Sequence, residues 1–364
     1  MMKIVGIFRG FPGLGRVVSG VELLQNFHRE HGAEIYIHTY LQGEVLLKQY
    51  HIPNQFSISQ LDISSIGIIP VSKYGEAILH SISKIKPDFV LIDGEPLMLQ
   101  ALKLACPDTH VIALLNPSDV ENPMNQNSSQ LFFNHYFSLS DLTIVHGLRK
   151  ISNPGKYKNF HSINTIIRTE ILDINQFIKS KQIFCVLGGG TVNVQNDFLE
   201  STLKIANLCF GLAKELVDYK ITIQCSSSNV YEIVSEKIKP NQPANLQLIS
   251  TIKLPTEYYS NSSLIITRAG RNSLSELLFL NIPAISFISG CSFRKEEQAC
   301  NARHSQNSQI KSLPTDIQLS QFVQSCKELL NENDIKETKS NFLPGNKVAT
   351  ELILNYLKNN NKLH

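Results

Sequence analysis

The sequence predicts a two-domain α/β protein in which each domain is a parallel sheet covered by helices. Its 364 residues exceed the size of one typical domain and suit two. Short β-rich runs alternate with helical patterns in both halves, which is typical of parallel sheets with helical crossovers. Several of these strands run directly into glycine-rich turns that precede helices, the place where open α/β sheets bind ligands.

Composition narrows the class of protein. Apolar residues make up 42% and charged residues 18% of the chain, as in a globular protein with a real core. The formal net charge of +3 is too small to indicate a nucleic-acid partner. The seven cysteines are scattered singly with no CxxC pair, so we expect neither a disulfide framework nor a zinc site. No apolar run approaches a membrane span. We therefore expect a cytoplasmic protein, and a peripheral contact with the inner face of the membrane stays open.

The first half contains the elements of one doubly wound domain, beginning with a buried strand at the N-terminus. We predict strands over Lys3–Phe8, Glu34–Thr39, Asp88–Ile92, His110–Leu115 and Leu142–Val145. Apolar residues at helical spacing predict helices between them, over Val17–His31, Lys73–Lys84 and Pro96–Ala105.

The second half repeats this organisation. We predict strands over Gln182–Leu187, Lys220–Gln224, Leu246–Ile249, Leu264–Thr267 and Ala284–Phe287, and helices over Phe198–Val217, Pro255–Ser260, Ser273–Leu280 and Glu296–Gln306. A mixed polar stretch over Ile151–Lys181 interrupts the pattern, and we expect the link between the two domains there. The expected domains are 1–160 and 161–345, followed by a helix and tail over 346–364 that lies on either domain.

The first two glycine-rich turns offer bare backbone to a ligand. Gly13 and Gly15 precede Arg16 after the first strand, but the dinucleotide fingerprint is incomplete and the second strand ends on no acidic residue, which disfavours NAD. Gly188, Gly189, Gly190 and Thr191 follow a buried strand without the lysine of a P-loop. Close approach to a phosphate explains these glycines, and tight packing is the alternative.

The third turn is the most informative. A strand ends at Thr267, and the small-residue turn that follows contains Arg268, Ala269, Gly270, Arg271, Asn272 and Ser273. Capped by Asn272 or Ser273, the next helix can neutralise a diphosphate with its N-terminus and no metal. Glu276, one turn later, is suited either to ribose hydroxyls or to the helix dipole. Glu297, Gln298 and Asn301 lie on a later helix, either to bind sugar hydroxyls or as a solvated face.

This order and spacing resemble the donor domain of GT-B glycosyltransferases, closest to the MurG-like family 28 proteins. The resemblance covers most of Gln182–Gln306 well and the N-terminal half more loosely. It implies two Rossmann-like domains that face a cleft. It also implies a nucleotide-sugar donor, best matched by a UDP-hexose or UDP-N-acetylhexosamine, with no cofactor and no metal at the diphosphate. Ile252 lies where the family contacts the donor base through its backbone.

In the N-terminal half, Gly13-Leu14-Gly15-Arg16 resembles the family's first loop, where a histidine commonly follows the glycines. Asp93-Gly94-Glu95-Pro96 resembles an Asp-x-Glu-Pro segment at a strand end. We expect Glu95, or else Asp93, to deprotonate the acceptor, and Arg16 to bind the diphosphate or an anionic group of the acceptor. A bland alternative is a capped turn that starts a helix at Pro96.

The resemblance implies sugar transfer with inversion to an acceptor hydroxyl that no motif identifies. A nucleotide-sugar hydrolase or 2-epimerase of the same fold is one alternative. A non-catalytic nucleotide-sugar-binding partner protein is another, because Arg16 replaces the family histidine.

Overall fold

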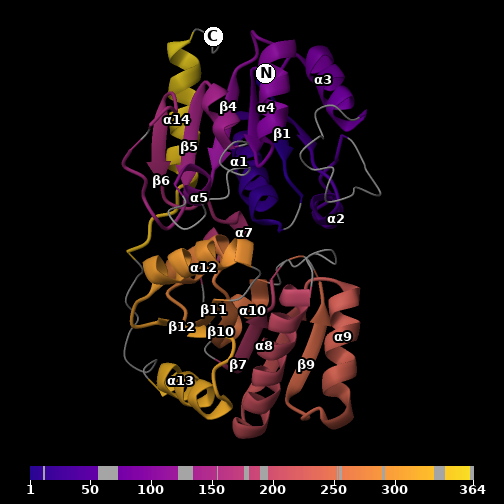
Figure 1. Cartoon of the computed structure of the whole chain (residues 1–364), viewed down its shortest axis with the longest axis vertical. Coiled ribbons are helices and arrows are strands. Elements are labelled where there is room, and N and C mark those ends of the chain that lie inside the picture. The colour runs from indigo at the N-terminus through magenta and orange to yellow at the C-terminus, as the bar shows by residue number, and fades with distance from the viewer. Residues whose placement is uncertain are drawn as a thin grey trace. The chain divides into compact units, whose positions relative to one another are not determined.

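The computed structural model describes residues 1–10, 13–55, 73–121, 134–153, 155–175, 180–188, 196–251, 253, 256–288, 292–331 and 341–360 (Figure 1). The chain divides into two compact units. The N-terminal unit comprises Met1–Arg168 together with Pro344–His364, and the C-terminal unit comprises Thr169–Leu343. Among the helices in these ranges, none combines the length and apolar character that crossing a membrane requires.

The N-terminal unit is built on a six-stranded parallel sheet in the order β2-β1-β3-β4-β5-β6. Its strands are β1 (Lys3–Phe8), β2 (Glu34–His38), β3 (Phe89–Asp93), β4 (Val111–Leu115), β5 (Leu142–His146) and β6 (Phe160–Ile163). Its helices are α1 (Gly15–His31), α2 (Gln42–Gln49), α3 (Lys73–Ile85), α4 (Pro96–Ala105), α5 (Pro117–Val120), the 3-10 helix η2 (Tyr136–Leu139) and the C-terminal α14 (Asn346–Asn359).

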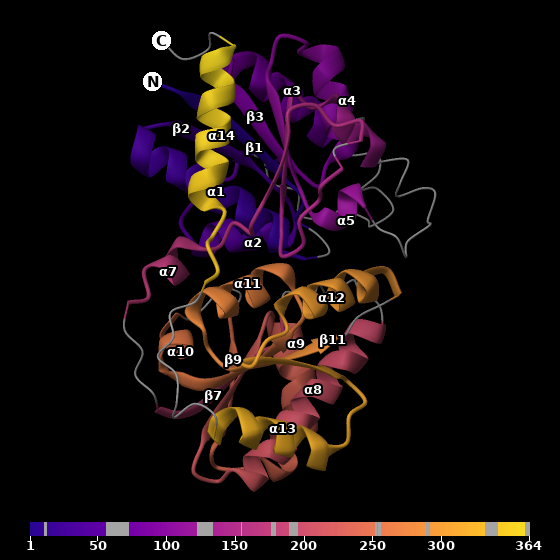
Figure 2. The same cartoon turned by 90° about the vertical axis from the view of Figure 1, so that its left-hand side faces the viewer.

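Helix α14 returns from the end of the chain to the N-terminal unit, where it packs against α1 and β5 (Figure 2). Asn26 on α1 donates a 3.0 Å hydrogen bond to the Thr350 hydroxyl, and the His110 ring lies 2.7 Å from the Tyr356 hydroxyl. Buried Ile353 and Leu357 form its apolar stripe. Helix α14 therefore belongs to the N-terminal unit, a question that the sequence analysis had left open.

The C-terminal unit is built on a second six-stranded parallel sheet, in the order β12-β11-β10-β7-β8-β9. Its strands are β7 (Ser180–Val186), β8 (Lys220–Cys225), β9 (Leu246–Ser250), β10 (Ser262–Arg268), β11 (Ala284–Ile288) and β12 (Ile310–Pro314). Its helices are α7 (Thr169–Leu172), α8 (Asn196–Glu215), α9 (Ser228–Ile238), the 3-10 helix η3 (Lys239–Asn241), α10 (Thr256–Asn261), α11 (Arg271–Leu280), α12 (Ser292–Ser305) and α13 (Leu319–Asn331).

Strand alternation divides the C-terminal core between the two faces of the sheet. Cys185 and its neighbours on one face pack with buried residues of α8, α9 and α13. On the other face Phe184 stacks on Tyr258, with ring centroids 4.7 Å apart, and meets Tyr259 edge-on. Burial on both faces explains why these strands are continuous apolar runs in the sequence.

Each sheet has one place where the order of its strands reverses. In the N-terminal sheet the chain moves outward in one direction from β1 to β2 and in the other from β3, so β1 and β3 flank the reversal. In the C-terminal sheet β7 and β10 flank it, which is the strand order of dinucleotide-binding folds. Crossovers leave on opposite faces there and open a crevice at the carboxyl ends of the strands, where ligands bind.

The structure confirms the predicted α/β class with two parallel sheets, and each predicted strand is present. Strands β6 and β12 were not predicted, because they lie at sheet edges, are mostly half-buried and carry polar residues. One local expectation was wrong. Helix α11 begins at Arg271 with Gly270 as its N-cap residue, so neither Asn272 nor Ser273 caps it.

Candidate functional site

The strand reversal in the C-terminal sheet is spanned by a buried arginine. Arg268 ends β10 and is only 7% exposed. Its Nε donates a 2.8 Å hydrogen bond to the carbonyl oxygen of Leu187, which follows β7. Gly188 comes next, with a positive φ of 82° that favours glycine, and a Cβ there would lie 3.5 Å from the Arg268 side chain. The arginine thus holds the start of the predicted glycine turn.

The two Nη atoms of Arg268 are directed at the first two turns of α8. Nη1 donates to the Ser201 hydroxyl at 2.9 Å, and Nη2 donates to the Thr202 hydroxyl at 2.6 Å and to the Phe198 carbonyl at 3.3 Å. The guanidinium also lies over the Phe198 ring, 4.1 Å from its centroid. Burial lowers the pKa of Arg268 to about 9, so the side chain is cationic at neutral pH.

The turn between β10 and α11 is tightly held by backbone bonds. Ala269 donates its N–H to Phe287 on β11 at 2.9 Å, and Gly270 donates to the carbonyl of Arg268 at 2.7 Å. Arg271 is buried and its Nε donates to the Asn272 side chain at 3.1 Å. Asn272 and Ser273 are half-buried in the first turn of α11.

Helix α12 packs against α11 and brings one of its polar side chains to this turn. The Asn301 amide donates to the Ala269 carbonyl at 3.3 Å, so two segments that are distant in the sequence meet as the predicted donor site requires. Gln298 and Glu297, on the same helix, are half-buried. Glu276 lies within α11 and is fully buried. Gly189, Gly190, Thr191 and Ile252 lie outside the described residues.

The strand reversal in the N-terminal sheet holds a cluster of buried charges. Arg16, in the first turn of α1, pairs with Asp93 at the end of β3 and donates to Asp119 on α5 at 2.8 Å. Burial opposes ionisation of Asp119. The charge and hydrogen bond of Arg16 and the Asn116 amide outweigh it, so the pKa of Asp119 lies below its usual range. Burial also opposes the charge of Arg16, but the two carboxylates raise its pKa well above its ordinary value.

Glu95 lies beside this network and is 2% exposed. The Tyr40 hydroxyl donates to its carboxylate at 2.5 Å, and Arg9 Nε lies 3.6 Å from the same oxygen. Burial raises the pKa of Glu95, and the opposing influence of Arg9, Tyr40 and Arg16 does not cancel it. A carboxyl group with a raised pKa is suited to proton transfer near neutral pH.

Gly94 allows both carboxylates to face these arginines. Strand β3 ends at Asp93, and Gly94 has a φ of 87°, where most side chains are strained. A Cβ at Gly94 would lie 2.6 Å from Arg16 Cδ and 2.7 Å from Arg9 Cβ. The strand has therefore ended before Glu95, and the backbone of the turn packs directly on the two arginines.

Sequence reasoning overlooked three members of this cluster, namely Arg9, Tyr40 and Asp119. Each follows a strand of the parallel sheet, β1, β2 and β4 respectively. Polar residues just beyond the carboxyl ends of adjacent parallel strands converge at one edge, and this signal was available in the sequence. Gly13 and Gly15 lie just before and at the start of α1, next to Arg16, and their expected role on the acceptor side stays a prediction.

Comparison with known proteins agrees with this geometry. Residues 183–353 match the glycosyltransferase family 28 C-terminal domain. Over 221 residues the chain is 24% identical to a Thermosipho africanus protein named UDP-N-acetylglucosamine–N-acetylmuramyl-(pentapeptide) pyrophosphoryl-undecaprenol N-acetylglucosamine transferase. That alignment covers 57% of this chain and 59% of the relative, so the chain spans about three fifths of the relative's length.

Solved structures share the fold over nearly the whole chain. MurG from Acinetobacter baumannii matches with a TM-score of 0.56 at 15% identity, over 98% of this chain and all of that one. The Staphylococcus aureus MnaA–UDP structure matches with a TM-score of 0.66 at 16% identity, over 100% of this chain and 98% of that one. A Neisseria meningitidis UDP-GlcNAc 2-epimerase bound to UDP-GlcNAc matches with a TM-score of 0.59 at 14% identity, over 97% of this chain and all of that one. Residues 183–353 thus match the glycosyltransferase family 28 C-terminal domain, and the chain shares the two-domain GT-B fold of these structures.

Proposed function

We propose that this protein is a glycosyltransferase that moves a hexose or N-acetylhexosamine from a UDP-linked donor to an acceptor hydroxyl. The observation that carries the proposal is the set of hydrogen bonds made by Arg268, called the Arg268 brace below. They connect the end of β10 to Leu187 after β7 and to α8, at the strand reversal inside the family 28 domain. Two structural neighbours are complexes with UDP and with UDP-GlcNAc.

The C-terminal unit binds the donor in this proposal. The turns at Gly188–Thr191 and Gly270–Asn272 receive the diphosphate, because the N-terminus of the helix that follows such a turn favours an anion. The N-termini of α8 and α11 and the cation of Arg268 add positive potential, so we propose that neither a metal nor a cofactor is needed. Glu276 binds the ribose, Ile252 contacts the base through its backbone, and Glu297, Gln298 and Asn301 bind sugar hydroxyls.

The N-terminal unit supplies the base in this proposal. Glu95 is favoured over Asp93, because Asp93 is paired with Arg16 whereas burial raises the pKa of Glu95. Arg16 then holds the cluster together by pairing with the carboxylates of Asp93 and Asp119, and it can also contact an anionic group of the substrate. Tyr40 and Arg9 orient the Glu95 carboxyl.

The proposed reaction is a single displacement with inversion. Glu95 accepts the proton of the acceptor hydroxyl while that oxygen forms a bond to the anomeric carbon. The bond from the anomeric carbon to the diphosphate oxygen breaks at the same time, and its electron pair leaves with UDP. The backbone amides of the two turns stabilise the charge that develops on the departing diphosphate.

Two measurements test this function. Thermal unfolding of the full chain with UDP, GDP and dTDP should show selective stabilisation by UDP, because a ligand of the native state shifts unfolding by mass action. UDP-sugars incubated with an acceptor panel should then release UDP only when an acceptor is present. If no uridine nucleotide stabilises the chain, the donor assignment is wrong.

A UDP-sugar 2-epimerase is the second candidate, because a UDP-GlcNAc 2-epimerase matches over 97% of this chain with a TM-score of 0.59. Product analysis separates the two functions. An epimerase converts UDP-GlcNAc to its 2-epimer without any acceptor, and a hydrolase releases the free sugar. A transferase leaves the donor unchanged until an acceptor is added.

A further inference from the structure

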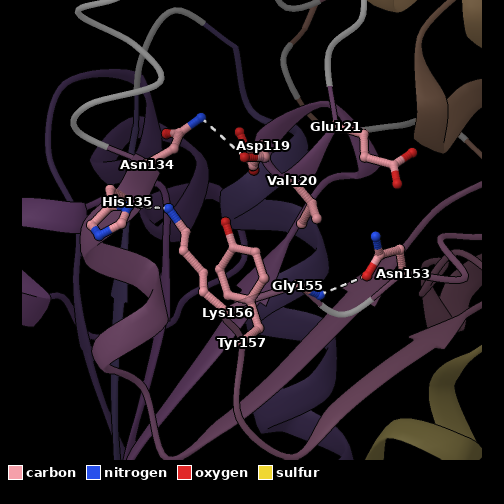
Figure 3. Close-up of a pocket in the computed structure, with 9 residues that line it drawn as sticks. All are labelled: Asp119, Val120, Glu121, Asn134, His135, Asn153, Gly155, Lys156 and Tyr157. Carbon is pink, nitrogen blue, oxygen red and sulfur yellow. Dashed lines mark hydrogen bonds between the residues drawn. The ribbon is translucent and has the colours of Figure 1, made fainter.

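The N-terminal unit contains a pocket that the donor site does not explain (Figure 3). It has a volume of about 260 Å³ and lies between α5, the residues that precede η2, and the loop that joins β5 to β6. Its lining includes Asp119, Glu121, Asn134, His135, Lys156 and Tyr157. This volume is below the range of about 300–1,000 Å³ found for drug-sized ligands, and it suits a single sugar ring.

Both carboxylates at the pocket are already matched by arginines. Asp119 accepts from Arg16 at 2.8 Å, and Glu121 accepts from Arg149 at 2.9 Å. Arg149 also donates to the Glu121 carbonyl at 2.7 Å, which fixes the end of α5. The acidic residues therefore contribute hydrogen-bond acceptors to the pocket without making it strongly negative.

Lys156 lines the same pocket and takes no part in the two arginine–carboxylate pairs. Its ammonium contacts the His135 ring and lies 5.8 Å from the centroid of the Tyr157 ring (Figure 3). Within the described ranges Lys156 forms no ion pair, and an ammonium that gives one N–H to His135 keeps two more for a ligand. Although the Lys156 side chain is exposed, partial desolvation lowers its pKa.

The other lining groups suit a polyhydroxylated ligand. The hydroxyl of Tyr157 points toward Asp119 and Val120 (Figure 3), and burial together with the charge of Asp119 raises the pKa of Tyr157 to about 12. It is therefore a hydrogen-bond donor at neutral pH, on a ring large enough to cover one face of a sugar. Asn153 accepts from the Gly155 N–H at 3.0 Å, which leaves its amide N–H groups for hydroxyl oxygens.

We propose that this pocket is the acceptor subsite and that it takes a sugar carrying an anionic substituent, either a carboxylate or a phosphate, held by Lys156. The proposal rests on the proposed transferase function. Asp119 lines the pocket and also pairs with Arg16, which in turn pairs with Asp93 in the cluster beside Glu95. A sugar in the pocket is thereby adjacent to the carboxylates assigned to proton transfer, within one structural unit.

Calorimetric titration of the full chain tests the subsite with three probes. These are glucuronic acid, N-acetylglucosamine 1-phosphate, and neutral N-acetylglucosamine. At least one anionic sugar should bind about tenfold or more tightly than the neutral sugar, since a hydrogen bond to a charged group contributes about 1.5–3 kcal/mol. The two anionic arms show whether the carboxylate or the phosphate is preferred. Equal affinity for all three probes, or binding of none, rejects the subsite.

Lys156→Met provides the second arm, with Lys158→Met as a matched control on the next exposed lysine of the loop. Lys156→Met should weaken the anionic sugar about tenfold or more and leave UDP affinity unchanged, while Lys158→Met and the conservative Lys156→Arg retain most binding. Unchanged anionic-sugar affinity in Lys156→Met overturns the proposal. If the wild-type chain does not bind UDP, the proposed transferase function is wrong. Failure of the acceptor subsite and failure of the proposed function therefore give different results.

Discussion

Arg268 Nε donates a 2.8 Å hydrogen bond to the carbonyl oxygen of Leu187, and this bond crosses the strand reversal of the C-terminal sheet. The same guanidinium donates to two hydroxyls and a carbonyl in the first two turns of α8. One side chain therefore fixes the end of β7, the start of the glycine turn and the beginning of a helix. In the proposed function Arg268 is therefore a positioning residue of the donor site.

Arg268→Met should weaken UDP binding by about tenfold or more, because the glycine turn and α8 lose their common support. Buried acceptors left without a donor should also cost about 1–3 kcal/mol of unfolding free energy. Calorimetry with UDP and urea unfolding measure the two effects. Arg303→Met, at an exposed site on α12, should change neither. Wild-type UDP affinity in Arg268→Met would show that the brace does not shape the donor site.

Glu276→Ala should reduce UDP affinity about tenfold, because it removes the buried carboxylate proposed to accept the ribose hydrogen bonds. Titration with UDP and with uracil separates the ribose contact from the base contact, and only the UDP titration should change. Glu236→Ala on the exposed side of α9 is the control. If both variants bind UDP as the wild type does, Glu276 has no role in ribose binding.

Glu95→Gln should reduce transfer about 10²–10⁴-fold, which is the range for loss of general base catalysis, with little change in UDP affinity. Because burial raises the pKa of Glu95, the native state holds this proton more tightly than the unfolded chain does. Its contribution to stability is therefore complete below its unfolded value and is lost as pH rises through the raised native value. At neutral pH we expect Glu95→Gln to be at least as stable as the wild type. Transfer within a few-fold of wild type would remove Glu95 as the base.

Gly94→Ala should destabilise the N-terminal unit by about 2 kcal/mol or more, because a positive φ is strained and the new Cβ meets Arg16 and Arg9. Gly32→Ala is a matched control, since Gly32 also has a positive φ of 63° but a Cβ there meets nothing within 4 Å. The control should cost only the backbone strain of about 1 kcal/mol. Equal urea midpoints for the two variants would contradict the close packing at Gly94.

His38 should make the N-terminal unit less stable as the pH falls. The side chain is 1% exposed, and burial lowers its pKa from 6.5 to about 4. The unfolded chain therefore binds a proton near pH 6.5 that the native chain resists, and stability is lost between these two values. Between about pH 7 and about pH 5 the loss from this group should be roughly 1–3 kcal/mol.

His38→Phe removes the titrating group and keeps an aromatic ring. Compared with the wild type, it should show a smaller loss of unfolding free energy over this pH range. Exposed His51→Phe is the control and should keep the wild-type pH dependence. A wild-type slope in His38→Phe would assign the acid sensitivity to other groups.

Much of the secondary structure was predictable because local pattern determines it. Buried parallel strands such as β4 and β10 are apolar runs, and helix α11, which follows β10, buries an apolar stripe that includes Leu274 and Leu277. The edge strands β6 and β12 escaped prediction because edge positions demand little burial. The N-cap of α11 at Gly270 escaped prediction because a backbone bond from Gly270 to the Arg268 carbonyl shapes this turn, whereas the sequence offered two ordinary capping residues.

Local pattern was enough to predict the alternating fold, the glycine turns and the two carboxylates of Asp93 and Glu95, because each depends on neighbours along the chain. The pairing of Arg16 with Asp93 and Asp119, and the contacts of Arg268 with Leu187 and α8, became visible only in the folded chain. These partners are brought together by strand order and crossover direction. A pattern read along one chain contains no information on which distant carbonyl or carboxylate a long side chain will meet.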